Sequence, residues 1–148
     1  MSSGNQLLTE WQHRYHERYF DEKGHLKLHF VQRAEIEPLA KAMADASPAL
    51  TRHQIRRFFQ HCRSIERRLK ASGTSQSTWG QVAPDVVKLD GAASDAFSKS
   101  ERKIPQIFHD FIKNNVAIVQ NERDFREGFL RHFEALIGFG QQYFKEKN

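Results

Sequence analysis

Cysteine is nearly absent from this chain of 148 residues, which contains only Cys62. A single cysteine excludes an internal disulfide and a zinc site built from cysteines, and it fits a reducing compartment. Apolar runs approaching the roughly 18 residues of a membrane span are also missing. The first twenty residues lack the apolar segment of a signal peptide. We therefore expect a cytoplasmic protein that does not enter a membrane.

The patterns that accompany catalysis are missing as well. The sequence has no glycine-rich phosphate loop, no nucleophile elbow and no cluster of carboxylates inside an apolar segment. Eight histidines are present, and the pairs His13/His16 and His25/His29 have spacings that metal ligands can use. No cysteine ligand or H-E-x-x-H pattern accompanies them, so we interpret them as exposed side chains. We expect no catalytic residue, no metal site and no cofactor.

The composition that remains is typical of a folded globular protein. Hydrophobic residues make up 39% and charged residues 28%, and twelve phenylalanines are available for a core. Only residues 25–30 alternate like a strand, while apolar residues elsewhere recur every three or four positions. We predict one all-α domain over residues 1–148, a bundle of about five to six antiparallel helices with a flexible loop at about 72–77. The expected helices cover residues 6–20, 34–45, 52–70, 78–98, 104–120 and 122–145.

The predicted helix at 52–70 contains the whole positive excess of the chain. Residues 50–70 contain seven Lys and Arg and one acid, which gives +6, whereas the full chain is +5. Thr51 and Gln54 have the spacing of a capping box, in which each side chain binds the backbone N–H of the other residue. Leu50 can pack on Ile55 across this cap. The start of the helix is therefore well specified.

On a helix with 100° per residue, the basic side chains of this segment align. Six residues fall within a stripe roughly 80° wide: Arg52, Arg56, Gln60, Arg63, Arg67 and Lys70. Apolar residues occupy the opposite side, while Arg57 and Arg68 lie off the stripe. Aligned like charges repel, and Glu66 is the only acid in the segment to offset them. Because arginine binds phosphate through two parallel hydrogen bonds, the stripe favours a nucleic-acid backbone over a merely solvated face.

Two stretches of the sequence resemble a known family, the small subunit of type III-A CRISPR effector complexes (the Csm small subunit). The first is YFDEKGHLK…AKAMADASPALTRHQIRRFFQHCRSIERRL, in which the family's start to a basic helix is matched by Leu50, Thr51, Gln54, Ile55, Arg56 and Phe58. The second is FREGFLRHFEALIGFGQQYFKE, with Phe133, Glu134, Ala135 and Tyr143. Together they cover residues 19–69 and 104–146.

The resemblance implies a role without catalysis. Such subunits stack in several copies inside an RNA-guided complex for antiviral defence, where they line the channel for guide RNA and single-stranded target RNA. They bridge the large polymerase-like subunit and the backbone subunits that bind the repeat. The family often has an aromatic residue followed by an arginine between its middle helices, for which Lys99, Arg102 and Lys103 after Phe97 are the candidates here. The predicted RNA-binding residues are therefore Arg52, Arg56, Arg57, Arg63, Arg67, Lys70, Lys99, Arg102 and Lys103.

Two other functions fit the basic helix. An interaction adaptor could dock the helix on an acidic partner protein without any nucleic acid. A small DNA-binding regulator would use a helix-turn-helix, but the segment DASPALT before the basic helix is longer than the usual three or four residues of that turn. Reading base edges would also require more Asn, Gln or Ser among the arginines.

Overall fold

The computed structural model describes residues 3–146, and within them the chain is helical, as predicted. Its six α-helices are α1 (Ser3–His16), α2 (Arg33–Asp45), α3 (Arg52–Lys70), α4 (Trp79–Ser98), α5 (Gln106–Ile118) and α6 (Leu130–Gly140). Short helical segments cover Leu28–Phe30, Gly73–Ser75 and Asp124–Phe129. No strand forms in this part of the chain, where the only β-type pairing is one isolated bridge between Phe20 and Leu26. The all-α class is confirmed.

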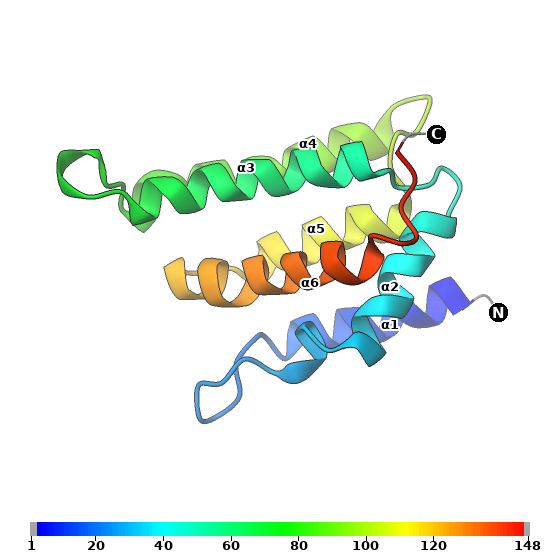
Figure 1. The fold of residues 1–148 in the computed structure, drawn as a ribbon, viewed down its shortest axis with the longest axis horizontal. Helices are drawn as coiled ribbons and strands as arrows, with labels where there is room; N and C mark the ends of the chain where they lie inside the picture. Colours follow the sequence, from blue (N-terminus) through cyan, green and yellow to red (C-terminus); the bar gives the residue numbers. More distant parts are fainter. Residues whose placement is uncertain (1–2, 147–148) are drawn as a thin grey trace.

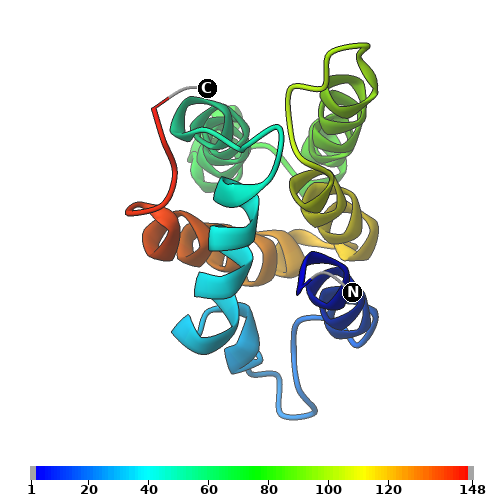
Figure 2. The ribbon, with the colours of Figure 1, turned by 90° about the vertical axis from the view of Figure 1, so that its right-hand side faces the viewer.

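The helices are arranged in layers. Helices α3 and α4 form an antiparallel hairpin on one side, and α4 packs on α5 in the middle of the molecule (Figure 1). Helix α5 also contacts α1, and α6 contacts α2. Figure 2 shows α2 standing across the direction of its neighbours. One hydrophobic core joins side chains from all six helices. None of the helices in residues 3–146 is both long enough and apolar enough to cross a membrane.

The start of α3 is built as the sequence predicts. The Gln54 N–H donates to the Thr51 hydroxyl over 3.2 Å, and the Thr51 N–H donates to the Gln54 side chain over 3.0 Å. Leu50 and Ile55 are both buried beside this cap. Helix α4 begins with a second capping box, made by Thr78 and Gln81. Each box satisfies two N–H groups that a helix start would otherwise leave unpaired.

Replacing Thr51 by alanine is expected to lower the free energy of unfolding by about 1 kcal/mol, because the first turn of α3 loses its hydrogen-bond acceptor. Urea unfolding of the purified protein measures the change. Thr51→Ser keeps the hydroxyl and serves as the matched control. An alanine variant as stable as the serine variant would contradict the contribution of the cap.

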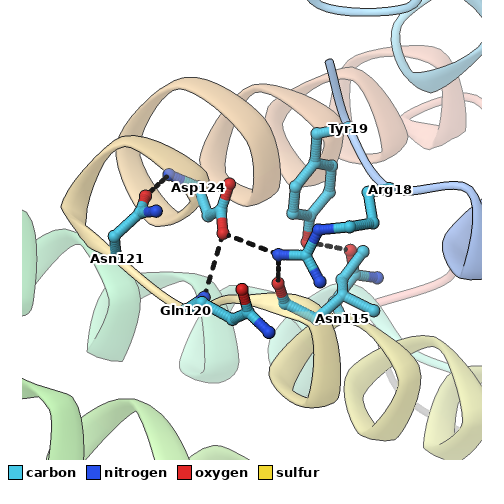
Figure 3. A network of polar contacts seen from close by, with 7 residues as sticks. Arg18, Tyr19, Asn115, Gln120, Asn121 and Asp124 are labelled. Carbon is cyan, nitrogen blue, oxygen red and sulfur yellow. Dashed lines mark hydrogen bonds and ion pairs between the residues drawn. The ribbon is translucent and has the colours of Figure 1, made fainter. Parts of the chain in front are cut away.

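The first helix ends earlier than predicted. We expected it to continue to residue 20, but α1 stops at His16, and Arg18 adopts a left-handed conformation with φ of 69°. This conformation lets the Arg18 guanidinium donate to the Ile118 carbonyl over 2.6 Å and to the Asp124 carboxylate over 3.0 Å. Figure 3 shows this network at the link between α5 and the last helical segment. These tertiary hydrogen bonds thus override the helical pattern at this position.

The last helix also differs from its predicted range of 122–145. Its start at residue 122 agrees with the prediction, and the Asp124 N–H donates there to the Asn121 side chain over 2.8 Å. Residues Asp124–Phe129 then form a π-helical segment before α6 continues to Gly140. The chain turns at Gly140 so that the buried ring of Phe144 packs against it.

Candidate nucleic-acid interface

The predicted stripe does not lie at the centre of the exposed side of α3. Ile55, Cys62, Ile65 and Leu69 are the buried residues of the helix, and Gln60 lies opposite them at the centre of the exposed side. The stripe therefore occupies one flank of this side, and its innermost edge faces α6 and the C-terminal segment. Its members consequently fall into two groups with different surroundings.

Three arginines form the outward group, which we call the free arginines: Arg56, Arg57 and Arg67. All three are exposed on α3, and none has an acidic partner within residues 3–146. Arg56 and Arg67 belong to the predicted stripe, whereas Arg57 lies on the α4 side of Gln60. An exposed guanidinium without a carboxylate keeps all its donors available for an external anion.

The other members of the stripe are paired with acids. Arg52 binds the Glu146 carboxylate over 2.9 Å and the Gln141 carbonyl over 2.7 Å. Arg63 lies 2.6 Å from Glu66 and 3.3 Å from Glu134, and Lys70 lies 3.3 Å from Glu66. Glu66 was visible in the segment, but Glu134 and Glu146 come from the last eighth of the chain and no local pattern could indicate them.

The pKa directions agree with this pairing. The pKa of Arg63 is raised, first by its hydrogen bond to Glu66. Burial by itself would raise the pKa of Glu66, but hydrogen bonds from Arg63 and Lys70 outweigh it and lower the pKa overall. Glu66 and Arg63 are thus both charged at neutral pH, and a cation paired with an acid presents less net charge to an external anion than a free arginine does.

Arg68 and His61 turn towards α4. Arg68 binds the Asp85 carboxylate over 2.5 Å, and that hydrogen bond is the main cause of the lowered pKa of Asp85. The His61 ring shares a hydrogen bond of 2.9 Å with the Asp85 backbone carbonyl. These interactions connect the two helices of the hairpin.

The link between α4 and α5 is held in a defined shape. The Lys103 N–H donates to the Ala96 carbonyl over 3.0 Å, and the Gln54 side chain donates to the Lys103 carbonyl over 2.5 Å. Ile104 is buried and anchors the end of the link. The predicted RNA-binding residues Lys99, Arg102 and Lys103 are therefore exposed on a fixed segment next to the start of α3.

One groove brings the link and α3 together. It is lined by Arg57 and His53 from α3, by Lys88 and Asp95 from α4, and by Lys99 and Lys103, over an apolar floor that includes Phe58 and Leu89. Lys99 is paired with Asp95 over 3.2 Å, and Lys103 with Glu101 over 3.7 Å. Arg57 of the basic helix thus shares one surface with Lys99 and Lys103 of the link, although these residues are far apart in the sequence. Lys88 is a member that the sequence did not indicate, because it lies on a helix without a basic pattern.

The remaining reactive or metal-binding side chains are not arranged as a site among the described residues. Burial raises the pKa of the Cys62 thiol to about 12, so this side chain is a neutral part of the core. Within the part of the chain that the structure describes, no group of three or more His, Cys, Asp or Glu side chains is placed to hold a metal ion.

Comparison with known proteins gives one match. Residues 29–146, most of the chain, match the family model described as Csm2 Type III-A. No curated protein and no solved structure matches the chain.

Proposed function

Since the chain belongs to the Csm2 family of small subunits of the type III-A CRISPR complex, we propose that it holds single-stranded RNA inside that complex by its phosphate backbone. The observation that supports this role is the set of free arginines on α3, three exposed guanidinium groups without a carboxylate among the described residues. Their interactions with RNA would be independent of sequence, as a subunit that must accept any guide or target requires.

The geometry of α3 suits an extended strand. Arg56 and Arg67 are separated by eleven residues, which corresponds to about 16 Å along a helix axis at 1.5 Å per residue. A strand lying along the exposed side of α3 would meet both, with Gln60 between them. Arg57 leads from this line into the groove with Lys99 and Lys103. The acid-paired Arg52 and Arg63 would instead hold α3 against the C-terminal segment and α6, and Lys70 pairs with Glu66 within α3.

The subunit works among other proteins, because its family is part of the Csm complex. We propose that it bridges the large polymerase-like subunit and the backbone repeat-binding subunits, and that further copies of itself adjoin it along the RNA. Its proposed role is to bind and position, without catalysis. The competing function is docking of the same arginines on an acidic protein surface.

The double variant Arg56→Glu/Arg67→Glu is expected to weaken single-stranded RNA binding by about 100-fold or more, because two charge-assisted interactions become repulsive. The slope of log affinity against log salt should fall by about 1.4, at about 0.7 for each phosphate that the variant no longer neutralises. Fluorescence anisotropy with a labelled oligonucleotide measures both, and far-UV circular dichroism checks that the helices persist.

Lys41→Glu/Lys113→Glu is the matched control, since it changes the net charge equally at exposed lysines on α2 and α5. It should bind RNA within a few fold of the wild type. If both double variants weaken binding to the same extent, net charge is responsible and the site on α3 is wrong. If the wild type binds polyglutamate but no RNA, the docking function replaces the proposed one.

A further inference from the structure

Three planar side chains are stacked at the link between α4 and α5. The Phe97 ring lies 4.7 Å from the His109 ring at an interplanar angle of 23°. The Arg102 guanidinium lies over the Phe97 ring, 4.3 Å from its centre. Phe97 thus contacts both His109 and Arg102, and Arg102 is the exposed residue of the three.

Arg102 differs from its neighbours in the link because it has no acidic partner among the described residues. Lys99 and Lys103 are each paired with an acid, whereas the Arg102 side chain lies on the Phe97 ring. A guanidinium over an aromatic ring can take a second planar group on its other face, and Arg102 is exposed. Because no carboxylate among the described residues pairs with it, its N–H groups are available to external acceptors.

The stack borders an open pocket. The pocket has a volume of about 860 Å³. It is lined by Phe97 and residues 98–103 on one side and by Ser47, Pro48 and Gln54 on the other. In Figure 1 the link lies at the same end of the molecule as the connection between α2 and α3, which supplies Ser47 and Pro48, and the start of α3 supplies Gln54. A pocket of this size can accept a flat ligand of the dimensions of a nucleobase.

We propose that this pocket receives one unpaired nucleobase of the bound RNA, which stacks on the outer face of Arg102. The proposal rests on the RNA-binding function proposed above and adds a second kind of interaction to it. A base has a planar face for the guanidinium and acceptor edges for its N–H groups, whereas a carboxylate would accept from the N–H groups and leave the planar face uncovered. Stacking on every base alike also keeps the site independent of sequence.

The groove beside α3 connects this pocket to the free arginines. Lys99 and Lys103 line both hollows, and Arg57 lines the groove. A strand held by its phosphates on α3 could therefore pass through the groove and direct one base into the pocket. Each subunit would then hold the strand at a fixed nucleotide as well as along its backbone.

The test compares a 12-nucleotide oligoadenylate with an abasic ribose–phosphate oligomer of the same length, which carries the same phosphates without bases. The wild type should bind the oligoadenylate about tenfold more tightly, because a stacked base is worth about 1–3 kcal/mol. Arg102→Lys keeps the positive charge but removes the planar group. It should bind the abasic oligomer as the wild type does and lose most of the preference for oligoadenylate.

Arg33→Lys is the matched control, because it makes the same exchange at an exposed arginine of α2 that lies over another aromatic ring, Phe139, outside the proposed RNA-binding surface. It should keep the preference. An equal preference in Arg102→Lys and the wild type would overturn the base pocket while leaving backbone binding intact. Failure of the wild type to bind either oligomer would overturn the proposed function itself, and the pocket with it.

Discussion

Acidification from pH 7.5 to pH 5 is expected to cost the fold about 2 kcal/mol through one buried histidine, His132. Its Nδ1 lies 2.7 Å from the Phe30 carbonyl and its Nε2 lies 2.9 Å from the Tyr15 hydroxyl. A carbonyl can only accept, so Nδ1 carries a proton. Burial lowers the pKa of His132 from 6.5 to about 3, so the ring is neutral at pH 7.5 and its Nε2 accepts from the Tyr15 hydroxyl.

The direction of the pH effect follows from this shift. Below about pH 6.5 the unfolded chain binds a proton at His132 and the folded chain does not, so acid favours unfolding. Each pH unit between about 6.5 and 3 then costs about 1.4 kcal/mol. The stabilisation from a neutral His132 is complete above about pH 6.5 and is lost progressively as the pH falls.

Urea unfolding at a series of pH values isolates this contribution when the wild type is compared with His132→Gln. Glutamine offers one donor and one acceptor but does not titrate, so the variant should lose about 2 kcal/mol less than the wild type between pH 7.5 and pH 5. His53→Gln, the same exchange at an exposed residue of α3, is the control for histidine content. Parallel pH profiles of His132→Gln and the wild type would show that His132 is not the group responsible.

Replacing Gly128 by alanine is expected to destabilise the protein by about 2–3 kcal/mol or more. A Cβ atom at this position would lie 2.6 Å from two carbon atoms of the Tyr19 ring. That ring cannot move aside easily, because it is fully buried and its hydroxyl donates to the Asn115 side chain over 2.7 Å (Figure 3). Thermal or urea unfolding gives the size of the loss.

Gly138→Ala, in α6 directly after the π-helical segment, is a control for which we expect a change in stability of the opposite sign. A Cβ at Gly138 meets no atom within 4 Å, and the residue is exposed in α6. Alanine there should stabilise the protein by about 0.5–1 kcal/mol, because it has the higher helix propensity. Equal effects of the two substitutions would contradict the close packing of Gly128 against Tyr19.

The parts of the fold that local signals specify were predictable. Thr51 and Gln54 indicated the start of α3, where the capping box forms. The predicted helix bounds are wrong where contacts with residues distant in the sequence determine the backbone conformation. Arg18 leaves the helical conformation because its partners are Ile118 and Asp124, about one hundred positions further along the chain. The π-helical segment likewise has no local signal that we recognise.

In the candidate interface, too, local patterns predicted one part and tertiary contacts determine the other. The periodicity of α3 correctly separated its apolar side from its basic side, but it treated all the stripe residues alike. Glu134 and Glu146 distinguish Arg52 and Arg63 from Arg56 and Arg67, and these acids reach α3 only through the tertiary fold. The stacking of Arg102 on Phe97 follows the order of aromatic and arginine that the family resemblance suggested. The contact of His109 with the Phe97 ring could not be derived from that order.

The hydrogen bond between Tyr15 and His132 joins the two ends of the chain, and this affects when the protein can fold during its synthesis. Ribosomes extend the chain from its N-terminus, yet the apolar face of α1 is covered by α5 and by residues of α6. Trp11, Tyr15 and Tyr19 therefore leave the ribosome long before the residues that bury them, and α1 cannot complete its packing until almost the whole chain has been synthesised. Nascent chains that stop before α5 will expose an aromatic surface, which makes them substrates for chaperones.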